Sequence, residues 1–491
     1  MIARSVVAIV LMIGFYLLGL TIGFGLLYIP YVTLMNGDHL DIRLALICIL
    51  GGLAILWSLV PRVDRFLAPG PRLDAADQPR LFERLRKLAL SVKQEMPKEV
   101  YLVPEMNAWV AQRGGIMGFG SRRVMGIGLP LLDIVSVPEF EAILAHEFGH
   151  YHEGDTRLGP WVYKTRSGIG RTITNLARLG EGRGGIFGFS AVMLQKPFIW
   201  YGNMFLRITH AISRAQELSA DRLAATAMGA GALADGLRAL HRSLQAYDYY
   251  LNSEIAPALR KGFLPPLLDG FSEFLRVENI AAATADNLEK ELAEAKIDPY
   301  DTHPPLAQRL AALAQMPPGR VIEDHSPAWT LLDNVEMLEA QLASSWVRPG
   351  TALKKLSWKE TGVSVLLPEW QQMCRENAGP LRNLTLNGLL DTVATTADFA
   401  KKTAAWTPSA HPDGLAGYAL SLLGATFCCA LYRDGWEIAN QPGVLMLKRG
   451  NIAFNPFDLI NSMRAPDFTK DKWEETLKRF GLDPQMELSS A

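Results

Sequence analysis

The chain has 491 residues, of which 49% are hydrophobic and 20% are charged, so it is long and apolar enough for two or three folded domains and is not intrinsically disordered. Its 49 Lys and Arg residues balance 50 Asp and Glu residues, which argues against nucleic-acid binding. The four cysteines form no C-x-x-C pair. We therefore expect neither a disulfide framework nor a cysteine zinc site, and a reducing compartment.

Two apolar runs open the chain. Residues 5–32 contain no charged side chain and are long enough to cross a hydrocarbon core of about 30 Å. Residues 44–60 form a second run at the lower length limit for a span. A signal peptide is the alternative interpretation of the first run. The run is, however, longer than the apolar region of a signal peptide, and it lacks a clear cleavage site. The sequence thus predicts a membrane hairpin over residues 1–65.

The charges that flank these runs predict the orientation of the hairpin. The intervening loop carries Asp38, Asp41 and Arg43, whereas arginines such as Arg62 and Arg65 follow the second run. The positive-inside rule then places both ends of the hairpin in the cytoplasm. We expect a multi-pass protein of the inner (plasma) membrane, in contact with the lipid bilayer and with the bulk of the chain on the cytoplasmic side.

A helix is expected to begin after residue 136. Residues 123–129 alternate like a strand, and Ser136 with Glu139 then forms a capping box. Pro138 lies in the first turn, where its missing N–H costs nothing. These signals place the following residues on a helix.

That helix carries the sequence H-E-F-G-H. His146 and His150 are four residues apart, so both imidazoles leave the same helix face and can bind one metal ion. Glu147 projects beside that ion, where its carboxylate can take a proton from a water that zinc has made acidic. This pattern is typical of a metal-dependent hydrolase. We find no G-x-S-x-G elbow and no P-loop that would favour another chemistry.

A catalytic zinc needs a third protein ligand, and Glu217 is the best candidate. Asp221, one helical turn later, can accept a hydrogen bond from a ligand imidazole and fix its orientation. Acidic residues four apart are also common on solvated helix faces, and an H-E-x-x-H string can arise by chance. The two patterns together favour one zinc ion per chain.

Residues 66–315 closely resemble the M48 family of membrane-associated zinc metallopeptidases. The matching pieces are Asn107-Ala108, Leu131-Leu132-Asp133, His146 to His150 with Asp155, Glu217 to Asp221, and Thr302-His303-Pro304-Pro305 with Arg309. The resemblance implies a mainly helical α+β, gluzincin-like domain, with zinc bound by His146, His150 and Glu217 and catalysis by Glu147. It also implies that the strand ending near Leu129 is a sheet edge to which an extended substrate adds hydrogen bonds.

His303 is a further candidate catalytic residue. It precedes two prolines, so its backbone is held extended. The family pattern places it facing the zinc, where it would donate a hydrogen bond to the developing oxyanion or occupy the open coordination position. The alternative is a residue packed for structure at the entry to a helix.

Three further segments bear on membrane contact. The family's transmembrane forms often have two more spans, but residues 186–194 and 198–208 are apolar runs too short to cross. We interpret them as a helix that covers the active-site cleft or lies at the membrane interface, with a real span as the alternative. Residues 415–432 are uncharged, and their small and polar residues favour a buried helix over a third span.

After residue 345 the resemblance ends. Residues 358–367, 436–438 and 444–447 are expected to be strands of a small α+β domain, with a turn at 441–443. The predicted organisation is a membrane hairpin over 1–65, a peptidase domain over 66–345 and an accessory domain over 346–491.

The sequence therefore predicts a membrane-anchored zinc endopeptidase that hydrolyses membrane-associated or misfolded proteins. The family resemblance alone supplies this quality-control role. One alternative is an idle pseudoprotease that acts as a membrane scaffold or binding module. Another is a zinc hydrolase with a non-peptide substrate.

Overall fold

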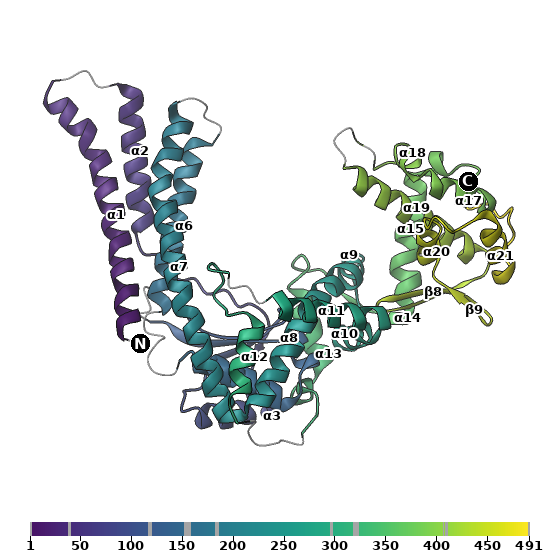
Figure 1. Ribbon diagram of the computed structural model, residues 1–491, viewed down its shortest axis with the longest axis horizontal. Coiled ribbons are helices and arrows are strands. Elements are labelled where there is room, and N and C mark those ends of the chain that lie inside the picture. The colour runs from purple at the N-terminus through teal and green to yellow at the C-terminus, as the bar shows by residue number, and fades with distance from the viewer. Residues whose placement is uncertain are drawn as a thin grey trace. The chain divides into compact units, whose positions relative to one another are not determined.

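The computed structural model describes residues 2–37, 41–115, 120–151, 159–181, 186–294, 298–317, 324–405, 407 and 411–489 (Figure 1). The chain is mostly helical and divides into two compact units. The first unit contains residues 1–242 and 285–335, and the second contains residues 243–284 and 336–491. The expected domain boundaries at residues 65 and 345 stay predictions.

The two apolar runs at the start of the chain are helices, as expected. Helix α1 (Ile2–Met35) and helix α2 (Ile42–Leu59) pack against each other, and both are long and apolar enough to cross a membrane. Their closest approach is at two glycines. A Cβ atom on Gly52 would lie 2.8 Å from the carbonyl oxygen of Gly23, so a larger residue would push the helices apart.

A second helical hairpin packs against the first. Helix α6 (Gly159–Gly180) and helix α7 (Ile186–Met228) run beside α1 and α2 (Figure 1). Their shared apolar core contains Phe15, Ile55, Ile169, Phe198, Tyr201 and Phe205. The hydroxyl of Tyr201 donates a hydrogen bond of 2.5 Å to the carbonyl oxygen of Leu11, which ties α7 to α1.

The expected short helix over residues 186–208 is therefore wrong in extent. These residues form the first half of the 43-residue helix α7, whose second half carries Glu217 and Asp221. Pro197 lies inside the helix, where its missing N–H weakens the hydrogen-bond ladder. Phe198, Tyr201 and Phe205, which follow it, are buried against the first hairpin, and this packing holds the helix continuous.

A small mixed sheet lies in the first unit, with strand order β1 (Arg72–Leu73), β2 (Glu99–Val103), β4 (Arg122–Gly128) and β3 (Ala108–Arg113). Strand β4 pairs with β2 in parallel and with β3 in antiparallel orientation, so it is an inner strand. The expected substrate edge at residues 123–129 is thus wrong. The edge is β3, because β3 pairs with β4 on the side opposite β2 and has no further strand beside it among the described residues.

Helix α5 (Val137–Gly149) begins at the predicted position. The Ser136 backbone N–H donates a hydrogen bond of 2.7 Å to a carboxylate oxygen of Glu139, which completes the capping box. Helices α3 (Pro79–Ser91) and α7 and strand β3 pack against α5, and α12 (Leu306–Ala314) packs against α7. The first unit also contains α4 (Leu129–Ile134) and the 3-10 turn Ala328–Leu331.

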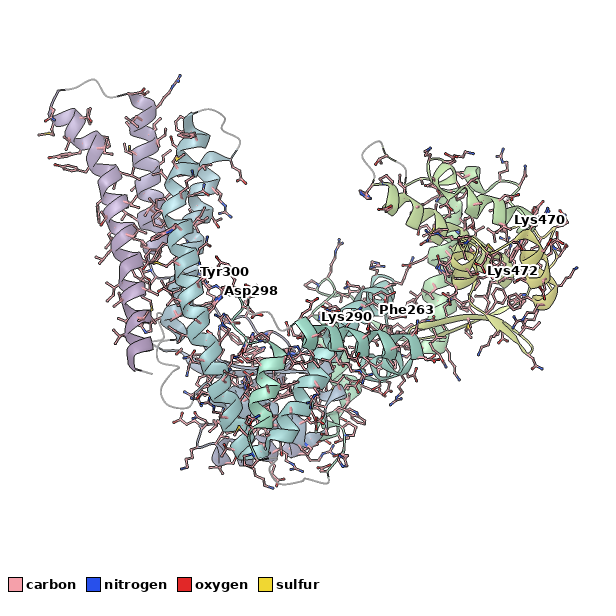
Figure 2. The ribbon with its side chains drawn as sticks, in the orientation of Figure 1. Phe263, Lys290, Asp298, Tyr300, Lys470 and Lys472 are labelled. Atoms are coloured by element: carbon pink, nitrogen blue, oxygen red, sulfur yellow. The ribbon has the colours of Figure 1, made fainter. Side chains whose placement is uncertain are left out.

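The segment that precedes α12 is held against α7. Arg214 of α7 donates hydrogen bonds through one guanidinium nitrogen to the carbonyl oxygens of Asp298 at 3.2 Å and Asp301 at 2.6 Å. Figure 2 shows Asp298 and Tyr300 beside this helix. The segment leads directly to His303.

The second unit contains most of the remaining elements. Helices α8 (Ala230–Tyr250) and α11 (Glu278–Glu294) pass from one unit to the other. The others are the π-helical turn Leu251–Ile255, α9 (Ala256–Arg260), α10 (Leu267–Arg276), α13 (Val335–Ser344), α16 (Ala378–Leu381), α17 (Leu386–Ala394), α18 (Thr396–Ala400), α20 (Pro456–Ser462), α21 (Lys470–Phe480), and the two-residue strands β5 (Phe263–Leu264) and β6 (Lys354–Lys355).

The strand prediction after residue 345 is correct only in part. Strands β7 (Glu437–Gln441) and β8 (Val444–Arg449) form the expected hairpin, and β9 (Ile452–Phe454) extends it. Residues 358–367 are instead helical, in α14 (Trp358–Thr361), a π-helical turn (Gly362–Leu366) and the start of α15 (Leu367–Glu376). A capping box between Ser357 and Glu360 starts this helix.

Helix α19 (Pro412–Arg433) forms the centre of the C-terminal core. It meets the length and composition of a membrane span, yet Leu422, Leu423, Phe427 and Leu431 are fully buried against neighbouring elements of the second unit. This burial agrees with the expected buried helix.

The end of β4 offers a test of the sheet. A Cβ atom on Gly128 would lie 2.1 Å from the carbonyl oxygen of Glu105 and 2.5 Å from that of Asn107, so Gly128→Ala must displace backbone. We expect it to destabilise the detergent-solubilised chain by about 1–3 kcal/mol or more. Gly170→Ala is the matched control, because no atom lies within 4 Å of its Cβ position. Equal melting temperatures for the two variants would contradict the described sheet.

Candidate metal centre

The two histidines of the H-E-F-G-H sequence lie on the face of α5 that meets α7. The ring centroids of His146 and His150 are 4.9 Å apart. Gly149 lies between them in sequence, and a Cβ atom there would be 2.9 Å from the Cα atom of Ala220 on α7. Only a residue without a side chain permits this helix approach, which brings Glu217 up to both imidazoles.

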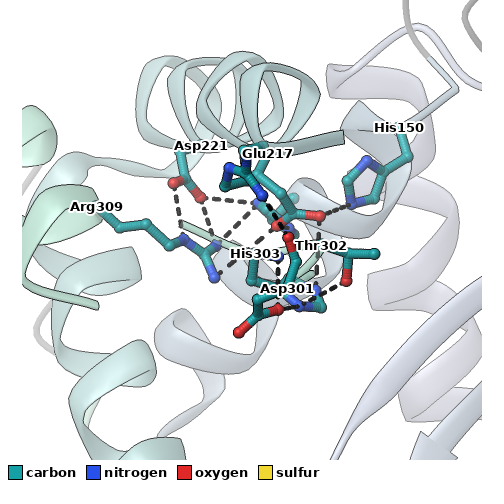
Figure 3. Close-up of polar contacts among 9 residues, drawn as sticks. His150, Glu217, Asp221, Asp301, Thr302, His303 and Arg309 are labelled. Atoms are coloured by element: carbon teal, nitrogen blue, oxygen red, sulfur yellow. Dashed lines mark hydrogen bonds and ion pairs between the residues drawn. The ribbon is translucent and has the colours of Figure 1, made fainter. Parts of the chain in front are cut away.

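Glu217 converges with the two histidines as predicted. Its two carboxylate oxygens lie 3.3 Å from Nε2 of His146 and 3.4 Å from Nε2 of His150 (Figure 3). One ligand atom each from His146, Glu147 and His150 also lies within 4.8 Å of the others. The structure therefore brings the proposed ligands and the proposed base into one cluster.

The donor set fits a zinc ion. The Oε2 atom of Glu217 is buried and has no partner of regular hydrogen-bond geometry among the described residues, although Nε2 of His146 lies 3.3 Å and Nη1 of Arg309 lies 4.0 Å from it. A buried carboxylate oxygen without such a partner costs free energy that a bound cation would recover. Two imidazole nitrogens and one carboxylate oxygen are ligands that zinc accepts in catalytic sites, where a fourth position stays open.

Two of the three proposed ligands, Glu217 and His150, have protonation states that suit a cation. Burial opposes ionisation of Glu217, but its hydrogen bond with His146 and the nearby histidines lower its pKa to about 2. Burial lowers the pKa of His150 to about 4. An ionised carboxylate and a neutral imidazole are the protonation states that metal ligation requires.

Asp221 lies where it can orient His146. Its Oδ1 atom is 2.8 Å from Nδ1 of His146. Burial disfavours the charged imidazole, but hydrogen bonds with Asp221 and then Glu217 raise the pKa of His146 to about 9. With Nδ1 directed at Asp221, the Nε2 atom of His146 faces Glu217.

Arg309 of α12 completes this arrangement and was not assigned a role from the sequence. Its buried guanidinium donates two hydrogen bonds to the Asp221 carboxylate, through Nε at 2.9 Å and Nη2 at 2.6 Å (Figure 3). This bidentate pair holds the Asp221 carboxylate in a fixed orientation beside Nδ1 of His146. The sequence signal is an arginine on the apolar face of a short helix, between the buried residues Leu306 and Leu313.

Glu147 is partly buried beside the cluster. Burial raises its pKa to about 7, and a backbone hydrogen bond from Val110 on β3 opposes the rise. The proposed general base therefore contacts the edge strand of the sheet. This contact puts the edge strand and the candidate site side by side.

His303 faces the cluster from the segment before α12. Its Nε2 atom lies 3.6 Å from a carboxylate oxygen of Glu217, and its Nδ1 atom is 3.1 Å from the hydroxyl of Thr302 (Figure 3). Its backbone N–H donates a hydrogen bond of 2.9 Å to Asp301. The side chain is exposed, so it is accessible at the mouth of the site. Asp155, part of the sequence resemblance, lies outside the described residues.

Comparison with known proteins identifies a family that this chain resembles. Residues 75–317 match the family model of peptidase family M48. The protease HtpX homolog of Desulfatibacillum aliphaticivorans is 25% identical over 243 residues, which are 48% of this chain and 67% of that protein. The homolog of Methylibium petroleiphilum is 27% identical over 259 residues, or 51% of this chain and 78% of that protein. No solved structure matches significantly. Residues 75–317 are therefore assigned to peptidase family M48, and the chain is similar to HtpX proteases and has helices long and apolar enough to cross a membrane.

Proposed function

We propose that this protein is a membrane-anchored zinc endopeptidase with a gluzincin-like catalytic domain. The observation that carries the proposal is the convergence of the buried Glu217 carboxylate on Nε2 of His146 at 3.3 Å and on Nε2 of His150 at 3.4 Å. In this proposal the three side chains hold one zinc ion, and Asp221 orients His146.

Zinc, when bound, would acidify a water molecule and polarise the scissile carbonyl group. Glu147 then takes the proton from the attacking water and passes it to the leaving amine. His303 donates a hydrogen bond from Nε2 to the oxyanion that develops on the carbonyl oxygen. Its exposed position next to Glu217 supports this role.

An extended peptide substrate would add to the free edge of β3. Main-chain hydrogen bonds with Ala108–Arg113 would align its backbone without demanding a particular side-chain sequence. The proximity of the Val110 backbone to Glu147 supports a substrate strand that runs beside the proposed base. Such recognition suits extended segments of membrane-associated or misfolded proteins.

The membrane part of the proposal rests on α1 and α2. They would anchor the chain in the inner (plasma) membrane, with the peptidase domain on the cytoplasmic side. A reporter domain fused after Arg80 should therefore show a cytoplasmic signal. A signal from the opposite side would overturn this topology.

The first prediction about the site concerns the metal. Purified chain should contain one zinc ion, and His146→Ala should abolish binding because it removes a ligand on which Asp221 also acts. Asp221→Ala should weaken zinc affinity by about 10- to 100-fold. Zinc would be measured by elemental analysis and chelator competition, with exposed His411→Ala as the control. Full zinc content in His146→Ala would end the proposed site.

The buried ion pair generates a prediction about stability. Arg309→Met leaves the buried Asp221 carboxylate without its bidentate partner, so we expect a loss of about 3–5 kcal/mol in unfolding free energy. Exposed Arg222→Met on α7 should change stability by less than about 0.5 kcal/mol. Denaturant unfolding of both variants measures the difference, and equal curves would show that the pair has no such role.

Glu147→Gln separates binding from catalysis. The amide cannot accept the water proton, so the peptidase rate should fall by about 100- to 10,000-fold while zinc content stays at one per chain. The variant should also retain substrates, which crosslinking in the native membrane would identify by enrichment over His146→Ala.

Enrichment of membrane proteins with extended segments would support the proposal. A single partner that wild type never cleaves would favour the pseudoprotease, and wild type that keeps zinc but cuts no protein would favour the non-peptide hydrolase.

His303→Ala tests the oxyanion role. Zinc content should stay unchanged while kcat falls by about 100-fold, because a transition-state hydrogen bond is lost. His241→Ala is the control, since that histidine pairs with Glu291 at 2.7 Å instead of facing Glu217. A faster His303→Ala enzyme would show that His303 gates the site, and an unchanged rate would leave it a structural residue at the entry to α12.

A further inference from the structure

One face of α7 lines a cavity that the proposed peptidase chemistry does not use. Its residues recur at spacings of three and four, which places them on a single helical face. Together with Val7 of α1 and Tyr300, they line an open cavity of about 930 Å³; the α7 residues are Trp200, Asn203, Met204, Arg207, Ile208, Ala211 and Ile212. All lining residues belong to the first unit.

The cavity has an apolar wall and one cationic group. Val7, Met204 and Ile208 supply much of the wall, while Arg207 and Asn203 are exposed at its side. No carboxylate among the described residues lies within ion-pair distance of Arg207, and no described group hydrogen-bonds to Asn203. An unpaired guanidinium beside an apolar surface favours an anionic amphiphile.

The size of the cavity favours a small molecule. Its volume falls in the range of about 300–1,000 Å³ that is usual for small-molecule sites. Nine residues line it, whereas a standard protein interface uses about 20–30 residues on each side. A packed helix of another protein therefore fits these observations less well than a lipid does.

The surroundings indicate where that molecule comes from. Val7 lies on the apolar helix α1, whose neighbouring residues Val6 and Val10 are 51% and 61% exposed. Trp200 at the rim is 66% exposed, and exposed tryptophans are enriched at membrane–water interfaces. The cavity thus adjoins side chains that a bilayer would cover.

We propose that this cavity binds one anionic glycerophospholipid from the surrounding bilayer. An acyl chain lies against Val7, Met204 and Ile208, and the phosphate pairs with Arg207 and accepts a hydrogen bond from Asn203. The same lipid contacts Tyr300, three residues before His303, in the segment that Arg214 fixes to α7 (Figure 2). The site stands on its own geometry and does not require the proposed peptidase activity.

Native mass spectrometry of the full-length chain in detergent tests this proposal. Added palmitoyl-oleoyl phosphatidylglycerol should remain bound at one molecule per chain, and palmitoyl-oleoyl phosphatidylcholine should bind about tenfold more weakly, because only the former carries a net negative charge for Arg207. Arg207→Gln should weaken phosphatidylglycerol binding by about tenfold. The control is Arg178→Gln, which removes one positive charge from an exposed position on α6 that does not line the cavity. This variant should retain phosphatidylglycerol binding.

A second variant tests the cavity itself. Ala211→Trp leaves Arg207 in place but fills the space between its neighbours, so it should also prevent lipid retention. Circular dichroism and size-exclusion chromatography would show that each variant keeps its helical fold. Equal retention of the two lipids by wild type, or undiminished phosphatidylglycerol in Arg207→Gln, would overturn the proposal.

Discussion

The close approach of α5 and α7 at Gly149 and Ala220 is the contact on which the candidate site depends. Two helices with ordinary side chains at this point would stand further apart, because a Cβ atom on Gly149 would collide with the α7 backbone. Glu217 would then fall short of the imidazoles on α5. The glycine inside the H-E-F-G-H sequence therefore decides whether a carboxylate that is distant in the chain can join the two histidines.

A second constraint is the burial of charge behind His146. Asp221 and Arg309 are both almost completely inaccessible, and their desolvation is tolerable only because they pair through two hydrogen bonds and Asp221 also meets the imidazole. The pair joins α7 to α12. It thereby links the two helices at the same point where it sets the orientation of His146.

Helix α7 connects the apolar bundle with the candidate site. Its first half packs through Phe198, Tyr201 and Phe205 against α1, α2 and α6, and its second half presents Glu217 and Asp221. Arg214, between these halves, holds the segment that leads to His303. A lipid bound at Arg207, as proposed, would contact the same helix and the same segment.

Local sequence signals were enough to predict some elements of this protein. The uncharged runs identified α1 and α2, the capping box at Ser136 located the start of α5, and the spacing of His146 and His150 placed both on one face. Each of these features depends on interactions between residues close in sequence or on the 3.6-residue period of the α-helix. Glu217 and Asp221 were found by pattern, and the structure places both beside the histidines.

Other features depended on contacts between distant segments, which one sequence does not reveal. The edge of the sheet is β3 because β4 pairs on both sides, and residues 186–228 stay one helix through Pro197 because buried aromatic residues hold it. Residues 358–367 are a different case, because their capping box at Ser357 and Glu360 is a local signal that indicates a helix, and the strand prediction followed the apolar residues instead. Arg309 gained its role only when folding buried it beside Asp221, 88 positions earlier in the chain, because an isolated arginine on a short helix gives no sign of which carboxylate it will meet.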